Sequence, residues 1–347
     1  MKILITGSLG LIGSTISNFY LDKNIDVLGV DNDQRKIFFG EKASNKQNLE
    51  FLNTRKNYSH FNVDIRDKSQ IENIFFNNKD IEMIVHCAAQ PSHDWARENK
   101  MVDFEINAIA TLNLLEISKN ILNDPIFIYM STNKVYGDNP NHLELVKSDT
   151  RYDLKSNDKF FNGIDTSMSI DQNLHSFFGI SKLTSDLIVQ EYGKTYNMKT
   201  ISLRGGCLTG GSHNGAKAHG FLSYLINSIK NDDEYTIEGY EGLQVRDNIH
   251  SEDVANLVEE IRKNPVCGEV YNIGGGRNNS VSVIEAIKKC ETILNKNALF
   301  NISKKNRLGD HKWYITDNSE LIQAFPNWSI TKDLDYIFDD IIKNSQQ

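Results

Sequence analysis

The stretch that decides the fold lies at the start of the chain and reads Lys2-Ile3-Leu4-Ile5-Thr6-Gly7-Ser8-Leu9-Gly10-Leu11-Ile12-Gly13. A short apolar run leads into three glycines, and an amphipathic segment follows them, which predicts a strand, a tight turn and a helix. In such a turn Gly7 allows the sharp bend, Gly10 lets a ligand approach the backbone, and Gly13 lets the helix pack on the strand. The first helical N–H groups, near Leu11 and Ile12, then face the turn and can bind a pyrophosphate.

A second predicted strand, Asp26–Val30, ends at Asp31, with Asn32 after it. An acid at this distance from the glycine turn accepts hydrogen bonds from the adenosine ribose hydroxyls of a dinucleotide. An acid there also repels a 2′-phosphate, so the sequence predicts NAD rather than NADP as cofactor. The alternative interpretation is a structural turn with a surface aspartate.

Composition excludes several classes of protein. The chain has 347 residues, of which 39% are hydrophobic and 24% charged, and its net charge is -8. The hydrophobic and charged fractions are ordinary for a globular protein. The negative net charge argues against a nucleic-acid partner. It also means that an anionic substrate must be bound by locally placed arginines. Apolar runs are too short for a membrane span, and the first strand starts too early to follow a signal peptide. Four scattered cysteines predict reduced thiols in a cytoplasmic protein and no metal site.

Further cofactor contacts are expected where later strands end. The strand within His60–Asp67 places Asp64 and Ile65 where they can reach the adenine, although Asp64 could instead cap the following helix. A buried strand over Glu82–Ala89 ends in small residues, against which a cofactor can lie, so Ala88, Ala89 and Gln90 are expected to line the site. The loop after it carries His93 and Asp94, which are either catalytic or a solvated pair. A helix predicted over Met101–Ser118 carries Asn107, which can donate to the cofactor or to a catalytic lysine.

Several motifs follow one another in an order that resembles the extended short-chain dehydrogenase/reductases of the nucleotide-sugar epimerase and dehydratase group. They are the glycine turn, Asp31, His86-Cys87-Ala88-Ala89, Ser131-Thr132-Asn133-Lys134-Val135-Tyr136-Gly137, Ser181-Lys182, Gln244-Val245-Arg246-Asp247, Tyr271-Asn272-Ile273-Gly274-Gly275-Gly276 and Arg307-Leu308-Gly309-Asp310. The resemblance implies an α/β fold, namely a Rossmann-like doubly wound parallel sheet with a smaller mixed α/β substrate domain. It also implies an NAD cofactor, a nucleotide-sugar substrate and a homodimer or homotetramer.

The order of these motifs along the chain also predicts the domain boundaries. We expect an NAD-binding domain over residues 1–204 and about 246–273. We expect a nucleotide-sugar-binding domain over about 205–245 and 274–347.

The residues after Thr132 distinguish among the reactions of this group. In the 4,6-dehydratases an Asp and a Glu at these positions perform the elimination, whereas this chain has Asn133 and Lys134. An amide and an ammonium cannot replace that acid–base pair, so dehydration is disfavoured and epimerisation through transient oxidation is favoured.

The chain departs from the family at one catalytic position. The family's Tyr-x-x-x-Lys unit places both side chains on one face of a helix, and the lysine lowers the pKa of the phenol. Here Lys182 is present, but the tyrosine position is Phe178. Three interpretations stay open. In the first, the protein is still an epimerase, and another group moves the proton with Thr132 relaying it; the candidates are His93, Asp94, His175, Tyr136 and Lys182. In the second it is a redox enzyme of altered chemistry, and in the third it binds NAD and a nucleotide sugar without turnover.

Candidate substrate contacts lie mostly in the second half of the chain. By resemblance Arg246 and Arg307 grip the diphosphate, since a guanidinium matches phosphate geometry, although each could form a surface ion pair instead. The remaining candidates are Asn133, Lys134, His175 and Arg204.

Overall fold

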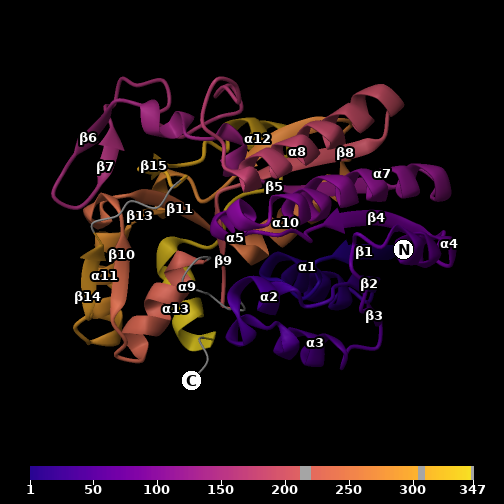
Figure 1. Cartoon of the computed structure of the whole chain (residues 1–347), viewed down its shortest axis with the longest axis horizontal. Coiled ribbons are helices and arrows are strands. Elements are labelled where there is room, and N and C mark those ends of the chain that lie inside the picture. Colours follow the sequence, from indigo (N-terminus) through magenta and orange to yellow (C-terminus); the bar gives the residue numbers. More distant parts are fainter. Residues whose placement is uncertain (212–219, 304–308, 345–347) are drawn as a thin grey trace. The chain divides into compact units, whose positions relative to one another are not determined.

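The computed structural model describes residues 1–211, 220–303 and 309–344. Residues 1–135, 176–204 and 254–271 form one unit, and residues 136–175, 205–253 and 272–347 form another (Figure 1). Each is described by itself.

The first unit is built on a seven-stranded sheet with strand order β12-β8-β5-β4-β1-β2-β3. The pairs β1–β2, β1–β4, β2–β3 and β4–β5 are parallel. Chain order therefore reverses between β1 and β4, which is where ligands bind in open parallel sheets. The strands are β1 (Lys2–Thr6), β2 (Asp26–Val30), β3 (Tyr58–Phe61), β4 (Ile81–His86), β5 (Ile126–Thr132), β8 (Lys199–Gly205) and β12 (Glu269–Ile273).

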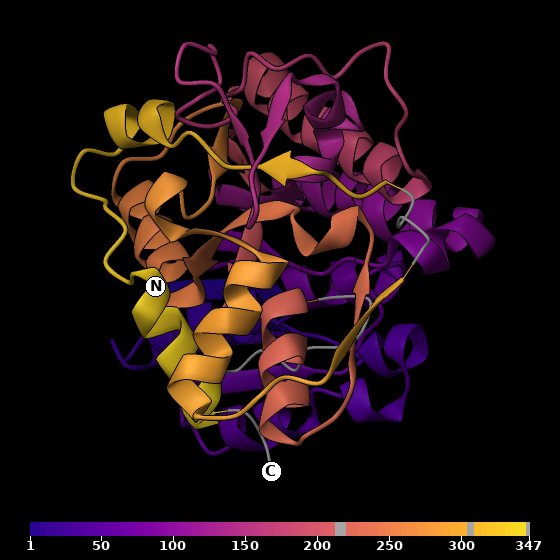
Figure 2. The ribbon, with the colours of Figure 1, turned by 90° about the vertical axis from the view of Figure 1, so that its left-hand side faces the viewer.

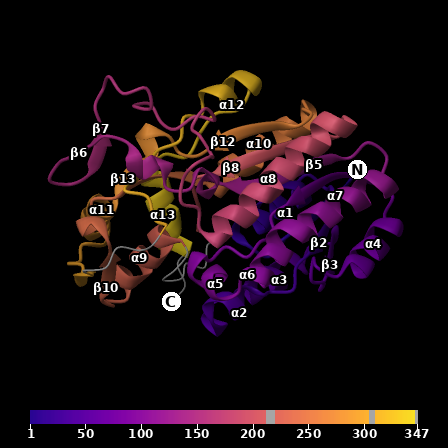
Figure 3. The ribbon, with the colours of Figure 1, turned by 45° about the horizontal axis from the view of Figure 1, so that its top comes forward.

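Helices cover this sheet because its central strands β1, β4 and β5 are mostly apolar and must be buried on both faces. The core on one face joins α4, α7 and α8 to the sheet, and Figure 3 shows these helices running along it. The helices are α1 (Leu11–Leu21), α2 (Arg35–Phe39), α3 (Lys46–Leu52), α4 (Lys68–Phe76), α5 (His93–Glu98), α6 (Lys100–Phe104), α7 (Ala110–Ile121), α8 (Phe177–Tyr196) and α10 (Ser251–Lys263), with 3-10 turns at Glu41–Ala43 and Asn133–Tyr136.

One predicted helix is interrupted. The helix expected over Met101–Ser118 is α6, a π-helical turn at Glu105–Ile109 and then α7. This wider turn contains Asn107, which is buried and bonded to several partners, and π-turns are frequently found at functional sites.

The second unit packs three helices, α9 (Phe221–Lys230), α11 (Val283–Leu294) and α13 (Leu334–Asn344), around a separate apolar core (Figure 2). Its small sheets pair β10 with β14, β6 with β7, and β11 with β9, β13 and β15. The other elements are β6 (Leu145–Lys147), β7 (Tyr152–Leu154), β9 (Cys207–Thr209), β10 (Tyr235–Glu238), β11 (Val245–His250), β13 (Ser280–Ser282), β14 (Phe300–Ser303), β15 (Trp313–Tyr314), α12 (Ser319–Ala324) and 3-10 turns at Asn139–His142, Tyr240–Gly242 and Arg277–Asn279.

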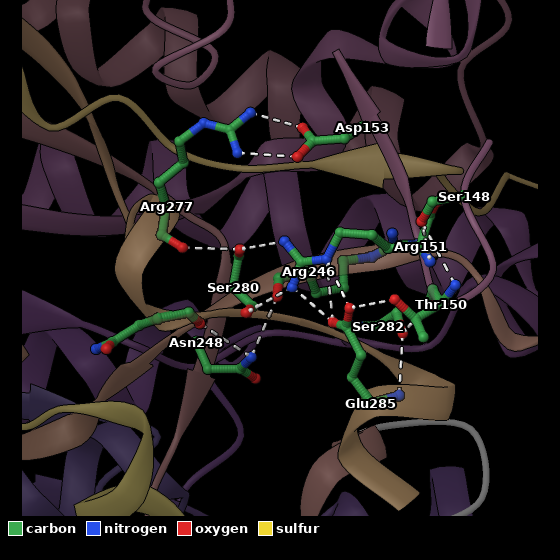
Figure 4. Close-up of polar contacts among 11 residues, drawn as sticks. Ser148, Thr150, Arg151, Asp153, Arg246, Asn248, Arg277, Ser280, Ser282 and Glu285 are labelled. Atoms are coloured by element: carbon green, nitrogen blue, oxygen red, sulfur yellow. Dashed lines mark hydrogen bonds and ion pairs between the residues drawn. The ribbon is translucent and has the colours of Figure 1, made fainter. Parts of the chain in front are cut away.

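The unit boundaries differ from the predicted domains, because residues 136–175 and 246–253 belong to the second unit. Two ion pairs hold the β6–β7 hairpin there (Figure 4). Arg151 Nη2 lies 2.6 Å from Glu285 Oε2, and Arg277 binds both carboxylate oxygens of Asp153 at 2.6 and 3.0 Å. These long-range contacts carry no local sequence signal, which is why the motif order alone assigned the segment to the cofactor domain.

Candidate functional site

The glycine turn between β1 and α1 is closely packed. A Cβ at Gly13 would lie 2.1 Å from the Gly7 carbonyl oxygen, and a Cβ at Gly7, where φ is +67°, would lie 2.7 Å from the Ala88 nitrogen. Gly10 is different, because the nearest atom to a Cβ there would be the Gly7 oxygen at 3.4 Å. Among the described residues no side chain caps α1, so its first N–H groups, near Leu11 and Ile12, face the turn uncapped.

Asp31 lies directly after β2, beside this turn. Its Oδ2 accepts from the Leu9 N–H at 2.9 Å, and its Oδ1 accepts from the Asp33 N–H at 2.8 Å. Burial raises the pKa of Asp31 to about 6, although these backbone donors oppose the shift. A partly desolvated acceptor at this point favours hydroxyl donors over anions. Asn32 is the next residue and is half-buried.

Asp64 follows β3, the neighbour of β2. Its carboxylate binds Arg66 Nη2 at 2.7 Å and Gln34 Nε2 at 2.5 Å. It does not cap α4, because Asp67 does so by accepting from the Gln70 N–H at 3.1 Å. The capping interpretation of Asp64 is therefore wrong. Ile65 is buried, with 6% of its surface exposed.

The backbone after β4 is fixed by Asn107. Asn107 Oδ1 accepts from the Gln90 N–H at 2.9 Å, and its Nδ2 donates to the Gln90 carbonyl at 3.1 Å and to Ser181 Oγ at 3.0 Å. Ala88 and Ala89 are half-buried in the segment so held. Asn107 thus fixes the backbone of Gln90 relative to Ser181 on α8.

Lys182 lies on α8 and is almost fully buried. Its Nζ donates to the Met130 carbonyl at 2.7 Å and lies 4.2 Å from the centre of the Tyr129 ring. Burial lowers the pKa of Lys182 to about 7, against the opposing charge of Asp186. The side-chain amine of Lys182 can therefore exchange a proton near neutral pH.

Phe178 lies one helical turn before Lys182 and is 7% exposed. The His93 ring meets it edge-on, with 4.8 Å between ring centroids. The structure thus places the His93 ring against Phe178, the residue at the family's tyrosine position. Asp94 is exposed on α5 and lies 3.7 Å from Arg97, a pairing typical of a helix surface.

Thr132, Asn133 and Lys134 end β5 and begin the following turn. Thr132 Oγ1 accepts from the Lys134 N–H at 3.3 Å, and Asn133 is buried. A Cβ at Gly179 would lie 2.9 Å from the Lys134 carbonyl oxygen, so this turn packs closely on the start of α8.

Arg204 forms a buried ion pair with Asp186, whose carboxylate also accepts from Ser131 Oγ. The distances are 2.9 Å from Arg204 Nη2 to Asp186 Oδ1 and 2.5 Å from Ser131 Oγ to Asp186 Oδ2. Breaking a buried pair leaves an uncompensated charge, so this contact is structural. Arg204 is accordingly not part of the substrate site proposed below.

The second unit holds the remaining candidates. Arg246 Nη2 binds Asp310 and, at 2.5 Å, the His311 carbonyl (Figure 4 shows the Arg246 side chain). His175 is half-buried, and burial lowers its pKa. Tyr136 donates to Asn272 Oδ1 at 2.7 Å and is fully buried, so the structure does not favour it as a proton donor to substrate. Arg307 lies outside the described residues.

Sequence reasoning did not predict that buried polar residues join into one hydrogen-bonded cluster with Asn107, namely Thr6, His86, Asp103, Thr111 and Ser181. The available signal was polar residues at positions that the apolar pattern buries, above all a histidine at the end of the apolar strand β4.

The first unit fits a dinucleotide. A close-packed glycine turn, an uncapped helix start and a half-buried carboxylate lie together at the switch point of the sheet. No helix in the described part of the chain combines the length and apolar character of a membrane span.

The chain belongs to the NAD dependent epimerase/dehydratase family, whose model matches residues 3–274. A CDP-paratose 2-epimerase of Salmonella typhi is 32% identical over 339 residues, which are 95% of this chain and 94% of that protein. A putative UDP-glucose 4-epimerase of Methanocaldococcus jannaschii is 30% identical and covers 86% of this chain and 85% of its own length.

Solved structures agree on the fold. The crystal structure of a UDP-glucuronic acid 4-epimerase from Bacillus cereus, in complex with UDP-glucuronic acid and NAD, has a TM-score of 0.81 and 24% identity, covering 99% of this chain and 98% of its own. The predicted Rossmann-like fold and membership of an enzyme family are thereby confirmed, and the family's description confirms NAD as its cofactor.

Proposed function

We propose that this chain is an NAD-dependent epimerase of a nucleoside-diphosphate sugar that works through transient oxidation to a keto sugar. The leading candidate reaction is that of CDP-paratose 2-epimerase. The observation that carries this proposal is the 32% identity, over 95% of the chain, to a protein of that name. Asn133 and Lys134 add support, since neither can serve as the acidic residue of an elimination.

NAD would be held by residues of the first unit. We assign the pyrophosphate to the turn at Gly7, Gly10, Leu11, Ile12 and Gly13, and the adenosine to the ends of β2 and β3 at Asp31, Asn32, Asp64 and Ile65. Ala88, Ala89, Gln90 and Lys182 would line the nicotinamide end. Bound NAD supplies a reversible hydride acceptor, so the overall reaction is redox-neutral.

The missing phenol requires another group to move the proton. We assign this role to His93, because its ring lies against Phe178, and an imidazole exchanges protons near neutral pH. Thr132 would orient the sugar hydroxyl. Lys182 is the second candidate, since its pKa of about 7 suits proton exchange, and Asp94 is the third.

Substrate recognition is proposed for three kinds of side chain: arginine, histidine, and the amide and ammonium groups after Thr132. Arg246 and Arg307 would bind the diphosphate, with Asn133, Lys134 and His175 at the sugar. In the structure Arg246 is held by Asp310 and the His311 carbonyl, which fixes the direction of its guanidinium.

We also propose that the protein is a homodimer, or a homotetramer that contains this dimer, located in the cytoplasm. Phe177, Ile180 and Leu187 form an apolar stripe on α8 and are 44–45% exposed, and Met101 on the adjacent α6 is 72% exposed. A second copy of the same helices would bury this face. In the described part of the chain no disulfide joins Cys87, Cys207, Cys267 or Cys290, and a reducing compartment keeps such thiols reduced.

The first experiment mixes purified protein with CDP-paratose, without added cofactor, and follows the sugar by proton NMR. Inversion at C2 supports the proposal, and His93→Ala should then abolish it while Asp94→Asn leaves a measurable rate. Inversion at C4 of another nucleotide sugar would replace the substrate but keep the reaction class. A requirement for added NADH or NADPH would indicate a reductase.

The second candidate function is a non-catalytic binder of NAD and a nucleotide sugar, and Phe178 favours it, because a phenyl ring has no proton to exchange. In that case both ligands raise the melting temperature, no sugar in the panel changes, and Phe178→Tyr alone does not create turnover.

A further inference from the structure

A line of buried hydrogen bonds runs through His86 at the end of β4. His86 Nδ1 lies 2.6 Å from Thr6 Oγ1, and His86 Nε2 lies 2.9 Å from Thr111 Oγ1. Beyond these, the Ala88 N–H donates to Thr6 Oγ1 at 3.2 Å, and Thr111 Oγ1 donates to the Asn107 carbonyl at 2.6 Å. The line therefore joins β1, β4 and the π-helical turn at Glu105–Ile109.

The direction of these bonds determines the imidazole tautomer. Thr111 has one hydroxyl proton and gives it to the Asn107 carbonyl, so toward His86 it can only accept. His86 must then carry its proton on Nε2, which leaves Nδ1 as an acceptor for the Thr6 hydroxyl. Burial, with the nearby positive charge of Lys182, lowers the pKa of His86 to about 3, so the ring stays neutral.

Both ends of the line reach segments that hold the cofactor site. At one end is Ala88, whose nitrogen lies at the glycine turn, 2.7 Å from where a Cβ of Gly7 would be. At the other end is Asn107, whose side chain holds both backbone polar groups of Gln90 and the hydroxyl of Ser181, the residue before Lys182. A neutral, singly protonated ring is the one form of histidine that satisfies both threonines.

We propose that His86 is a positioning residue: its Nε2-protonated imidazole sets the distance between the Ala88–Gln90 backbone and α8, and thereby shapes the NAD site. This inference rests on NAD binding by the family and not on the identity of the sugar, so it can fail or succeed independently of the proposed reaction.

The first test reads the tautomer in the full-length wild-type chain by ¹⁵N NMR of labelled histidines. We expect one imidazole with the signature of a neutral, Nε2-protonated ring that does not titrate between about pH 5 and about pH 9. An assigned His86 resonance that is protonated on Nδ1, or that titrates in this range, overturns the proposal.

The second test separates the two halves of the line. Thr111→Ser keeps the hydroxyl, whereas Thr111→Val keeps the shape and leaves Nε2–H without its acceptor. We expect Thr111→Val to shift His86 toward the Nδ1-protonated form and to weaken NAD binding roughly tenfold in calorimetric titration, with Thr111→Ser close to wild type. Equal NAD affinity in both variants, whatever their stability, contradicts a positioning role.

A third set addresses His86 directly. A glutamine nitrogen can take the place of Nε2, and an asparagine oxygen the place of Nδ1, so each of His86→Gln and His86→Asn keeps one half of the line. We expect both to bind NAD more weakly than His142→Gln, a control on an exposed histidine. If neither His86 variant folds, the two Thr111 variants and the wild-type ¹⁵N spectrum still test whether His86 positions the NAD site.

Discussion

We assign both the turn after β1 and the start of α8 to the proposed NAD site, but the two regions are built on different principles. The turn is made almost wholly of backbone, with glycines where a Cβ at Gly7 or Gly13 would overlap neighbouring main chain. The start of α8 is made of side chains: Phe178 against His93, and Lys182 buried over Tyr129. The glycine turn keeps the family's pattern, whereas the start of α8 departs from it at Phe178, which stands at the position of the family's tyrosine.

This difference indicates which properties of the protein can change independently. A backbone site tolerates no substitution at its close contacts, so an NAD site at this turn would depend on the glycines at Gly7 and Gly13. A side-chain site can lose one group and use another from a neighbouring loop. The following predictions test this contrast.

The largest effect is expected at Lys182. Lys182→Met should reduce turnover by about 10²–10⁴-fold, because it removes the cation proposed at the nicotinamide end, which is also the second candidate for proton exchange. It should also raise the melting temperature of the cofactor-free protein. The folded-state pKa is lowered, so the desolvation cost is complete below about pH 7 and disappears as pH rises toward the ordinary lysine value. The stability gain should therefore shrink above about pH 7, and Lys194→Met, an exposed lysine on α8, should show neither effect.

Next is the pair Gly13→Ala and Gly10→Ala. Gly13→Ala places a Cβ 2.1 Å from a carbonyl oxygen and should prevent stable folding, whereas Gly10→Ala meets only a 3.4 Å contact and should fold. Because Gly10 is where the pyrophosphate would lie against the backbone, Gly10→Ala should weaken NAD binding at least tenfold in calorimetry. If Gly10→Ala binds NAD normally, the assignment of this turn to the pyrophosphate is wrong.

Asp31→Asn should weaken NAD binding by roughly tenfold, since charge-assisted hydrogen bonds contribute about 1.5–3 kcal/mol. The same change should stabilise the cofactor-free protein. The folded-state pKa of Asp31 is raised to about 6, so stability falls as pH rises from the ordinary aspartate value to about 6. The gain in melting temperature should thus be full above about pH 6 and vanish in acid, the opposite trend to Lys182→Met. Asp26→Asn, at the exposed start of β2, is the control.

The smallest effect is expected from Phe178→Tyr. If His93 moves the proton, an added hydroxyl should leave turnover within about twofold of wild type or lower it, because the ring packs edge-on against His93. A rise of tenfold or more in the initial rate would indicate instead that Phe178 is a lost tyrosine whose restoration repairs the site.

Local sequence patterns predicted the elements that form the cofactor edge. β1, α1, β2 and β4 lie where apolar runs and glycines placed them, because the apolar pattern and a missing Cβ are properties of a few adjacent residues. The same patterns misjudged α6 and α7, since the π-helical turn between them depends on Asn107 finding partners in Gln90 and Ser181.

The sequence by itself determined the family, the glycine turn, the acid after β2 and the replacement of a tyrosine by Phe178. Only the tertiary structure decided that Arg204 pairs with Asp186, that His93 lies against Phe178, and that His86 bridges two threonines. The physical reason is that burial and long-range pairing set the charge and tautomer of a polar side chain. Its partners come from strands and helices distant in the chain, and no local pattern encodes them.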